Sequence, residues 1–145
     1  GFNGRHMTMN HDPKYLIYPP GAKLPLFPAN PEVLLGRIIL VEGIFDMLNL
    51  YDKGLRNTVC CFGTVKLLGK NNTDAKNKLN LLKLKGVGGI DIFFDGDEAG
   101  QAAAEGVKEL CEQLEFDVRN ICFKNKDPGE LTASQVLKLK VKLYD

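Results

Sequence analysis

The sequence predicts an α/β fold with one mostly parallel sheet of four strands, helices on both faces of the sheet, and an irregular segment in front. From Arg37 onward, short apolar runs that are typical of buried strands alternate with longer segments of helical spacing. Residues 1–36, in contrast, contain all but one of the seven prolines and show little periodicity. Strands that alternate with helices at these lengths indicate right-handed crossovers and therefore parallel pairing.

The first strand is predicted over residues 38–41, where Ile-Ile-Leu-Val forms a run of the kind that is buried on both faces. Helical spacing follows over residues 44–53, and Gly54 is suited to end that helix. Residues 58–62 form a second apolar strand that ends at Gly63. A strand, a helix and a strand thus make the first crossover unit.

The rest of the chain continues the alternation. The polar residues 65–72 are predicted to form a loop. The elements after it are a helix over 73–84, a strand over 90–94, a helix over 98–114, a strand over 118–123 and a helical segment over 129–143.

Length and composition limit the classes of function. A chain of 145 residues, 44% of them hydrophobic, is long enough for one domain with its own core. Its formal net charge of +1 provides no global attraction to nucleic acid or membrane, so such affinity must come from local patches. The four cysteines have no metal-ligand spacing, and the adjacent Cys60 and Cys61 are expected in the core. This cysteine usage predicts a reducing, cytoplasmic compartment.

The most informative segment is Phe94-Asp95-Gly96-Asp97, in which two carboxylates follow the predicted strand. Carboxylates at the end of a buried strand repel each other and lose hydration, so they are costly unless a cation compensates them. The carboxyl edge of a parallel sheet is also where α/β folds bind ligands. The segment therefore predicts a site for a hard divalent cation, Mg²⁺, with Mn²⁺ as a substitute.

Further acids follow the first and fourth predicted strands. Glu42 closes the first strand, and Asp46 falls in the first turn of the next helix, where the helix N-terminus alone also favours an acid. Asp127 follows the fourth strand and has an alternative function as the N-cap of a helix with Pro128 at its first position. If the first and third strands are adjacent, these acids converge at one edge of the sheet.

These motifs resemble the Toprim domain, which bacterial-type primases, topoisomerases and certain nucleases and repair proteins share. Glu42-Gly43-x-x-Asp46, followed by Asp95-Gly96-Asp97-x-Ala99-Gly100, is similar to the version in DnaG-type primases. Asp127-Pro128, near Glu130-Leu131, is similar to the element that follows the last strand there. Gly129 departs from the family pattern, because that element usually has a second aspartate, and the outermost metal position therefore lacks one carboxylate.

The N-terminal segment adds a second resemblance. Gly1-Phe2-Asn3-Gly4-Arg5 and Pro13-Lys14-Tyr15-Leu16 resemble the stretch that precedes the Toprim fold in DnaG-type primases. The resemblance implies that residues 1–36 are an irregular leader, the remnant of a basic N-terminal subdomain, and that residues 37–145 are the Toprim domain. It also implies that the chain, which begins with glycine, is a piece of a larger enzyme.

The function that the resemblance implies is that of the Toprim catalytic core of a DNA primase, which makes RNA primers from ribonucleoside triphosphates on single-stranded DNA. The acids that would hold the catalytic Mg²⁺ ions are Glu42, Asp46, Asp95, Asp97 and Asp127. Glu42, Asp95 and Asp97 would be the catalytic residues, and Glu42 would assist proton transfer from the attacking hydroxyl.

Basic residues outside this cluster are candidates for phosphate contacts. By the resemblance, Arg5 and Lys14 would lie on a face that meets template, nucleotide or primer. Lys66 and Lys70 belong to the predicted loop after the second strand, at the same edge as the acids. The expected partners are the single-stranded DNA template, ribonucleoside triphosphates and the RNA primer. A replicative helicase would bind through parts outside this chain, and no membrane partner is expected.

Two other functions would use the same residues. A Toprim nuclease would use the same metal ions to cleave a phosphodiester bond, and the acids alone do not exclude it, although the N-terminal motifs count against it. A non-catalytic Toprim module would bind DNA or protein, and Gly129 is the local hint of lost metal affinity. A topoisomerase would need a tyrosine nucleophile, and no tyrosine of the chain stands in a suitable context.

Overall fold

A computed structural model of the chain describes residues 2–5, 7, 15–20, 24–63 and 73–145. Its main sheet has four parallel strands in the order β4-β3-β5-β6. The strands are β3 (Arg37–Val41), β4 (Thr58–Cys60), β5 (Gly89–Ile92) and β6 (Asp117–Asn120). The predicted fold class is confirmed, and β3 and β5, the first and third strands of the sequence pattern, are adjacent at the centre of the sheet.

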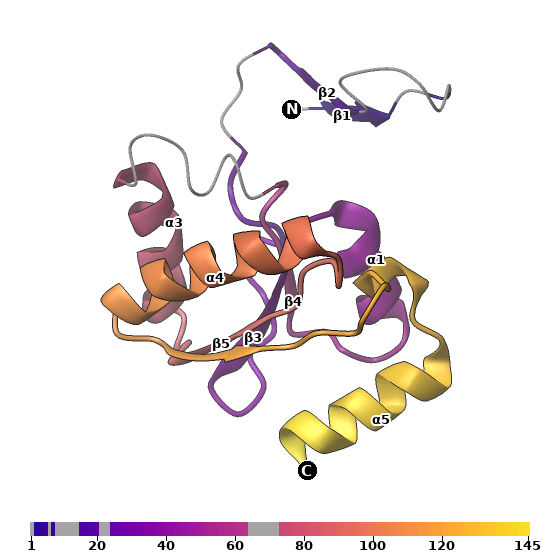
Figure 1. Ribbon diagram of the computed structural model, residues 1–145. Helices are drawn as coiled ribbons and strands as arrows, with labels where there is room; N and C mark the ends of the chain where they lie inside the picture. The colour runs from indigo at the N-terminus through magenta and orange to yellow at the C-terminus, as the bar shows by residue number, and fades with distance from the viewer. Residues whose placement is uncertain (1, 6, 8–14, 21–23, 64–72) are drawn as a thin grey trace.

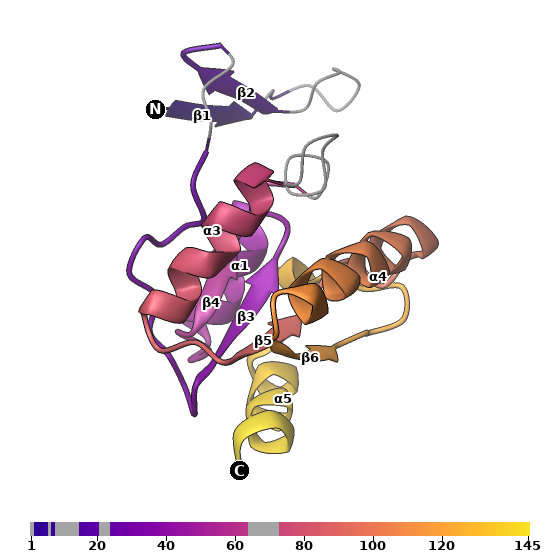
Figure 2. The same cartoon turned by 90° about the vertical axis from the view of Figure 1, so that its left-hand side faces the viewer.

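Helices cover both faces of this sheet, as Figures 1 and 2 show. The helices are α1 (Ile44–Asp52), α3 (Thr73–Leu84), α4 (Glu98–Gln113) and α5 (Ala133–Tyr144). α3 and α4 pack on one face, and α1 and α5 pack on the other. Successive residues of β3 alternate between the two layers, with Ile38 in the first and Ile39 in the second, and both are fully buried.

The N-terminal segment forms a separate antiparallel pair of short strands, β1 (Phe2–Arg5) and β2 (Tyr15–Tyr18). Figure 1 shows this pair apart from the main sheet. Nearer the main sheet, Phe27 forms an antiparallel bridge with Cys60 at the β4 edge. The predicted irregular leader therefore contains local strand pairing but contributes no strand to the main sheet in the described part of the chain.

The last helix begins later than the sequence pattern indicates. Instead of a helical segment from Gly129, the chain forms a 3₁₀ turn, η1 (Pro128–Glu130), and α5 then starts after Thr132. Thr132 and Gln135 form a reciprocal capping box, in which each side chain accepts a hydrogen bond from the other residue's backbone amide. Leu131, only 1% exposed, is buried between the turn and the helix. The capping chemistry and this burial together override the helical spacing.

Strand ends also differ slightly from the prediction. β4 stops at Cys60 because Phe62 adopts a left-handed backbone conformation with φ 57°. β6 stops at Asn120, although the Ile121 amide still donates to the carbonyl of Ile92 at 2.8 Å. Cys60 and Cys61 are buried and free, as expected for small core residues. No helix in the described ranges has the length and apolar character needed to cross a bilayer.

Candidate metal centre

Acidic residues converge at the carboxyl edge of the main sheet. Glu42 follows β3, Asp95 follows β5, Asp127 lies on the segment after β6, and Asp46 joins them from the first turn of α1. We call these four residues the edge acids. Asp46, Asp95 and Asp127 each offer one carboxylate oxygen, and these oxygens lie within 4.8 Å of one another. Clustered carboxylate oxygens are ligands that Mg²⁺ and related hard cations prefer.

Asp46 is held in place by two backbone amides. Its Oδ2 accepts a hydrogen bond from Gly43 N at 3.2 Å, which caps α1. Its Oδ1 accepts a second bond from Gly129 N at 3.0 Å, which ties α1 to η1. A Cβ on residue 129 would lie 2.8 Å from this oxygen, so the glycine that departs from the family pattern permits the close approach. Each oxygen keeps a further lone pair, so the capping bond does not exclude a cation.

Gly96 brings two loops of the site together. A Cβ on this residue would lie 1.7 Å from the carbonyl oxygen of Phe123, so only glycine allows the segment after β6 to pack here. The Gly96 amide also donates to Lys126 O at 3.0 Å. These contacts press the segment that leads to Asp127 against the turn that carries Asp95.

Asp97 has a different primary contact from the edge acids. It is the N-cap of α4, and its Oδ1 accepts a hydrogen bond from Gly100 N at 2.7 Å. Asp97 is exposed and does not belong to the group of three carboxylates within 4.8 Å. The sequence predicts a metal ligand at this position. In the structure Asp97 lies beside the three carboxylates and caps α4 through Oδ1, while its Oδ2 takes no part in the capping bond.

The edge acids repel one another. Burial, followed by the charges of Asp95 and Asp46, raises the pKa of Glu42 to about 7. Burial, followed by the charges of Asp127 and Asp95, raises the pKa of Asp46 to about 6. The pKa values of Asp95 and Asp127 are also raised, in each case first by burial and then by a neighbouring carboxylate. Upward shifts of this kind mean that the negative charge is not compensated within the protein.

Asp91 shows the opposite arrangement. This fully buried carboxylate accepts hydrogen bonds from Arg37, Arg119 and Tyr144. Burial opposes its ionisation, but the hydrogen bonds lower the pKa of Asp91 below its ordinary range. Among the described residues, in contrast, no lysine or arginine forms an ion pair with any of the edge acids. Oxygen donors with uncompensated charge fit a divalent cation.

The predicted basic contacts are only partly described. The backbone of Arg5 lies in β1, whereas Lys14, Lys66 and Lys70 lie outside the described residues. Two other lysines, Lys124 and Lys126, are exposed on the segment between β6 and Asp127.

Sequence reasoning missed two residues that shape the molecule. Asp91 lies inside the predicted third strand, and a charge within an otherwise apolar run is a signal of a buried ion pair. Asn49 follows Asp46 by three residues on α1, a spacing that places both on one side of the helix. Its side chain binds the carbonyls of Pro128 and Leu131 at the two ends of η1.

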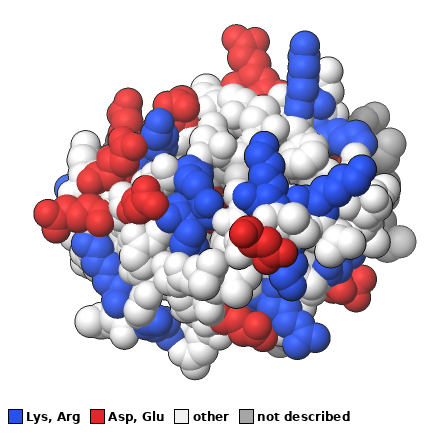
Figure 3. Space-filling model, turned by 90° about the horizontal axis from the view of Figure 1, so that it is seen from below, with Lys and Arg blue, Asp and Glu red and all other residues white. Residues whose placement is uncertain are grey.

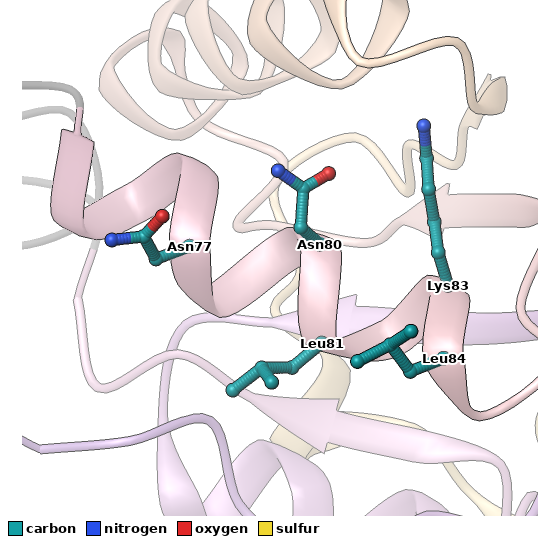
Figure 4. A pocket seen from close by; sticks show the side chains of 5 residues that line it. All are labelled: Asn77, Asn80, Leu81, Lys83 and Leu84. Carbon is teal, nitrogen blue, oxygen red and sulfur yellow. The ribbon is translucent and has the colours of Figure 1, made fainter.

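Other surface features lack the chemistry of the edge acids. A hollow of about 520 Å³ lies on α3, and Figure 4 shows its lining: Asn77, Asn80, Leu81, Lys83 and Leu84. No acid is among these side chains. Seen from the side of α5, positive and negative side chains are interspersed, so no field of a single sign marks that face (Figure 3). The edge acids are therefore the best candidate site in the described part of the chain.

A comparison with protein families accounts for this arrangement. A model of the Toprim-like family matches residues 39–132, which are more than half of the chain and include every edge acid. The chain belongs to the Toprim-like family. This Toprim-like chain is 35% identical over 139 residues to the DNA primase of Aquifex aeolicus and 32% identical over 138 residues to that of Clostridium acetobutylicum. Each alignment covers 90% of the chain but only 26% and 22% of the relative, so the chain spans about a quarter of their length.

Solved structures support the same assignment. The structure of the zinc-binding and RNA polymerase domains of the Aquifex aeolicus primase matches with a TM-score of 0.72 at 30% identity, over 97% of this Toprim-like chain and 35% of that one. The catalytic domain of a DnaG primase bound to single-stranded DNA matches with a TM-score of 0.66 at 22% identity, over 99% of this chain and 46% of that one, which supports the fold alone. The resemblance to the Toprim domain of DnaG-type primases is thus confirmed.

Proposed function

We propose that this chain is the Toprim catalytic core of a DNA primase, which synthesises RNA primers from ribonucleoside triphosphates on single-stranded DNA. The observation that carries the proposal is the uncompensated group of edge acids at the carboxyl edge of a Toprim-like sheet. Similarity to two DNA primases over 90% of the chain supports the same reaction. In this assignment residues 37–145 form the catalytic domain, and residues 1–36 are a leader from the N-terminal basic subdomain.

The acids contribute according to their positions. Asp46, Asp95 and Asp127 bind a divalent cation, Mg²⁺ or Mn²⁺, because their oxygens already lie within 4.8 Å of one another. Glu42, half-buried with a pKa of about 7, is suited to accept the proton of the attacking 3′-hydroxyl. Asp97 holds the start of α4 and adds negative charge beside the cation. The cation, when bound, neutralises charge on the triphosphate and favours ionisation of the attacking hydroxyl.

Nucleic acid is proposed to contact the basic residues Arg5, Lys14, Lys66 and Lys70. If Arg5 contacts a phosphate, Arg5→Ala weakens binding to single-stranded DNA and makes its salt dependence shallower. Fluorescence anisotropy titrations at several salt concentrations measure both quantities, and an unchanged salt slope would remove Arg5 from the binding face. A replicative helicase is expected to bind through regions other than this chain.

The test of the function is a primer synthesis assay with the full-length protein, single-stranded DNA, labelled ribonucleotides and Mg²⁺ or Mn²⁺. The wild-type protein is expected to make short labelled oligoribonucleotides, and Asp95→Asn is expected to abolish them because it removes a cation ligand. Asp52→Asn makes the same chemical change at the exposed last residue of α1, at the end of the helix opposite Asp46, and is expected to have no effect.

The other outcomes identify the rival functions. Shortened DNA without labelled primer would assign the acids to a nuclease, and binding without either product would indicate a non-catalytic module. Asp95→Asn is also expected to leave the metal-free melting temperature almost unchanged, because the substitution relieves carboxylate repulsion. A marked fall in that temperature would contradict the metal site.

A further inference from the structure

The amide side chain of Asn49 ties the turn that follows Asp127 to α1. Asn49 Nδ2 donates to Pro128 O at 2.9 Å and to Leu131 O at 3.1 Å. Pro128 is the first residue of η1, and Leu131 is the residue directly after the turn, so one amino group holds both ends of the turn. Both protons of that group are used in these bonds.

The other end of the amide is also held. Asn49 Oδ1 accepts a hydrogen bond from Lys53, one turn further along α1, which directs the amino group toward η1. Asp46, on the same side of α1, accepts the Gly129 amide from within the same turn. Two side chains of α1 therefore make three hydrogen bonds to the backbone around η1. Together these bonds restrict both the position and the orientation of η1 relative to α1.

This attachment opposes an electrostatic force. η1 brings the charges of Asp127 and Glu130 close to the other edge acids, and like charges push the turn away from α1. Asn49 is a neutral donor, so the group that bonds the turn brings no charge of its own. The buried Leu131 anchors the chain after the turn, but an apolar contact has little directionality and does not set the position of a carboxylate.

We propose that Asn49 is a positioning residue of the metal centre, which holds η1 on α1 so that Asp127 reaches the cation shared with Asp46 and Asp95. The inference rests on the proposed function, because it requires the edge acids to bind a divalent cation. Asn49 acts through Asp127 and is not itself a ligand, since both of its donors face backbone carbonyls.

The test is Mn²⁺ binding to the full-length protein, measured by electron paramagnetic resonance of free Mn²⁺. Leucine is similar in size to asparagine and is a good helix former, so Asn49→Leu removes both donors without disrupting α1. Loss of a group that orients a metal ligand typically weakens binding 10- to 100-fold, so we expect Mn²⁺ affinity to fall by roughly 10-fold or more. Asn77→Leu makes the same change at an exposed position on α3 and is expected to bind Mn²⁺ like the wild type.

A second readout separates positioning from general stability. In the primer assay, Asn49→Leu is expected to need a higher Mg²⁺ concentration for half-maximal activity, while activity at saturating Mg²⁺ approaches the wild-type value. A merely structural function would lower activity at every Mg²⁺ concentration and would overturn the inference. If the leucine variant does not fold, Asn49→Ala is measured in its place, because alanine also lacks both donors.

The remaining outcomes distinguish this inference from the proposed function. Wild-type Mn²⁺ affinity in Asn49→Leu would overturn the positioning function and leave the proposed function intact. No Mn²⁺ binding by the wild type, or binding that Asp95→Asn does not weaken, would overturn both.

Discussion

At the scale of residues, the surroundings of a carboxylate determine what it can do. Asp91 is fully buried, yet two guanidinium groups and a phenol hydroxyl hold it in the ionised form. The edge acids are less buried, but the described residues give them no cationic partner, so their charge favours a cation from outside the chain. Asp91 is therefore structural, and the edge acids form the candidate site.

The raised pKa values predict how stability depends on pH. The pKa of Glu42 rises from 4.5 to about 7, and that of Asp46 from 3.8 to about 6. Between the ordinary and raised values, the folded protein binds more protons than the unfolded chain, so the free energy of unfolding falls as pH increases. The pKa of Asp91 is lowered, so its stabilising contribution is complete above its ordinary value of 3.8 and constant in this range.

We therefore expect the metal-free protein to melt at a higher temperature near pH 5.5 than near pH 7.5. Mg²⁺ should raise the melting temperature more at the higher pH, because the cation binds the ionised carboxylates. Differential scanning calorimetry with and without Mg²⁺ measures both effects, and Glu42→Gln should flatten the pH dependence. A metal-free melting temperature that increases over this range would contradict the assigned pKa shifts.

At the scale of elements, the approach of one loop to another decides whether the acids meet. Glu42 and Asp95 follow β3 and β5 at the same edge, but Asp127 reaches Asp95 only because the segment after β6 packs directly on Gly96. η1 is then held on α1 by Asn49 and Asp46. The site therefore depends on backbone packing as much as on the acids themselves.

Gly96→Ala is expected to disrupt this packing. Because its Cβ would lie 1.7 Å from Phe123 O, a backbone atom, the loops must separate, and overpacking of this kind typically costs about 1–3 kcal/mol of stability. The shift in melting temperature caused by Mg²⁺ should also fall, because Asp127 moves away from Asp95. Gly88→Ala is the matched control, since a Cβ there has no atom within 4 Å. Equal melting temperatures and equal Mg²⁺ effects in the two variants would refute this account.

At the scale of the whole molecule, the Asp91 network joins elements that are distant in sequence. Arg37 comes from β3, Asp91 from β5, Arg119 from β6 and Tyr144 from α5. Asn57, just before β4, extends the network by donating to Tyr144 OH at 3.0 Å. The network therefore fastens the C-terminal helix to the face of the sheet.

Asp91→Asn is expected to lower the free energy of unfolding by about 3 kcal/mol, since removing one member of a buried ion pair leaves the others uncompensated. Urea denaturation measures this loss. Asp117→Asn is the control, because Asp117 also pairs with Arg37 but its side chain is 77% exposed, and it should cost less than about 1 kcal/mol. Equal losses in both variants would contradict a special function for the buried carboxylate.

The sequence by itself determined the fold class, the order of strands and helices, and the acids at the strand ends. These features leave local signals, because strands buried on both faces are continuous apolar runs and a charge that ends such a run is conspicuous. Only the tertiary structure decided that Asn49 holds a turn 79 residues away. It also decided that Asp46, Asp95 and Asp127 face one another. Such contacts depend on how distant segments pack, and no pattern within a single segment records that packing.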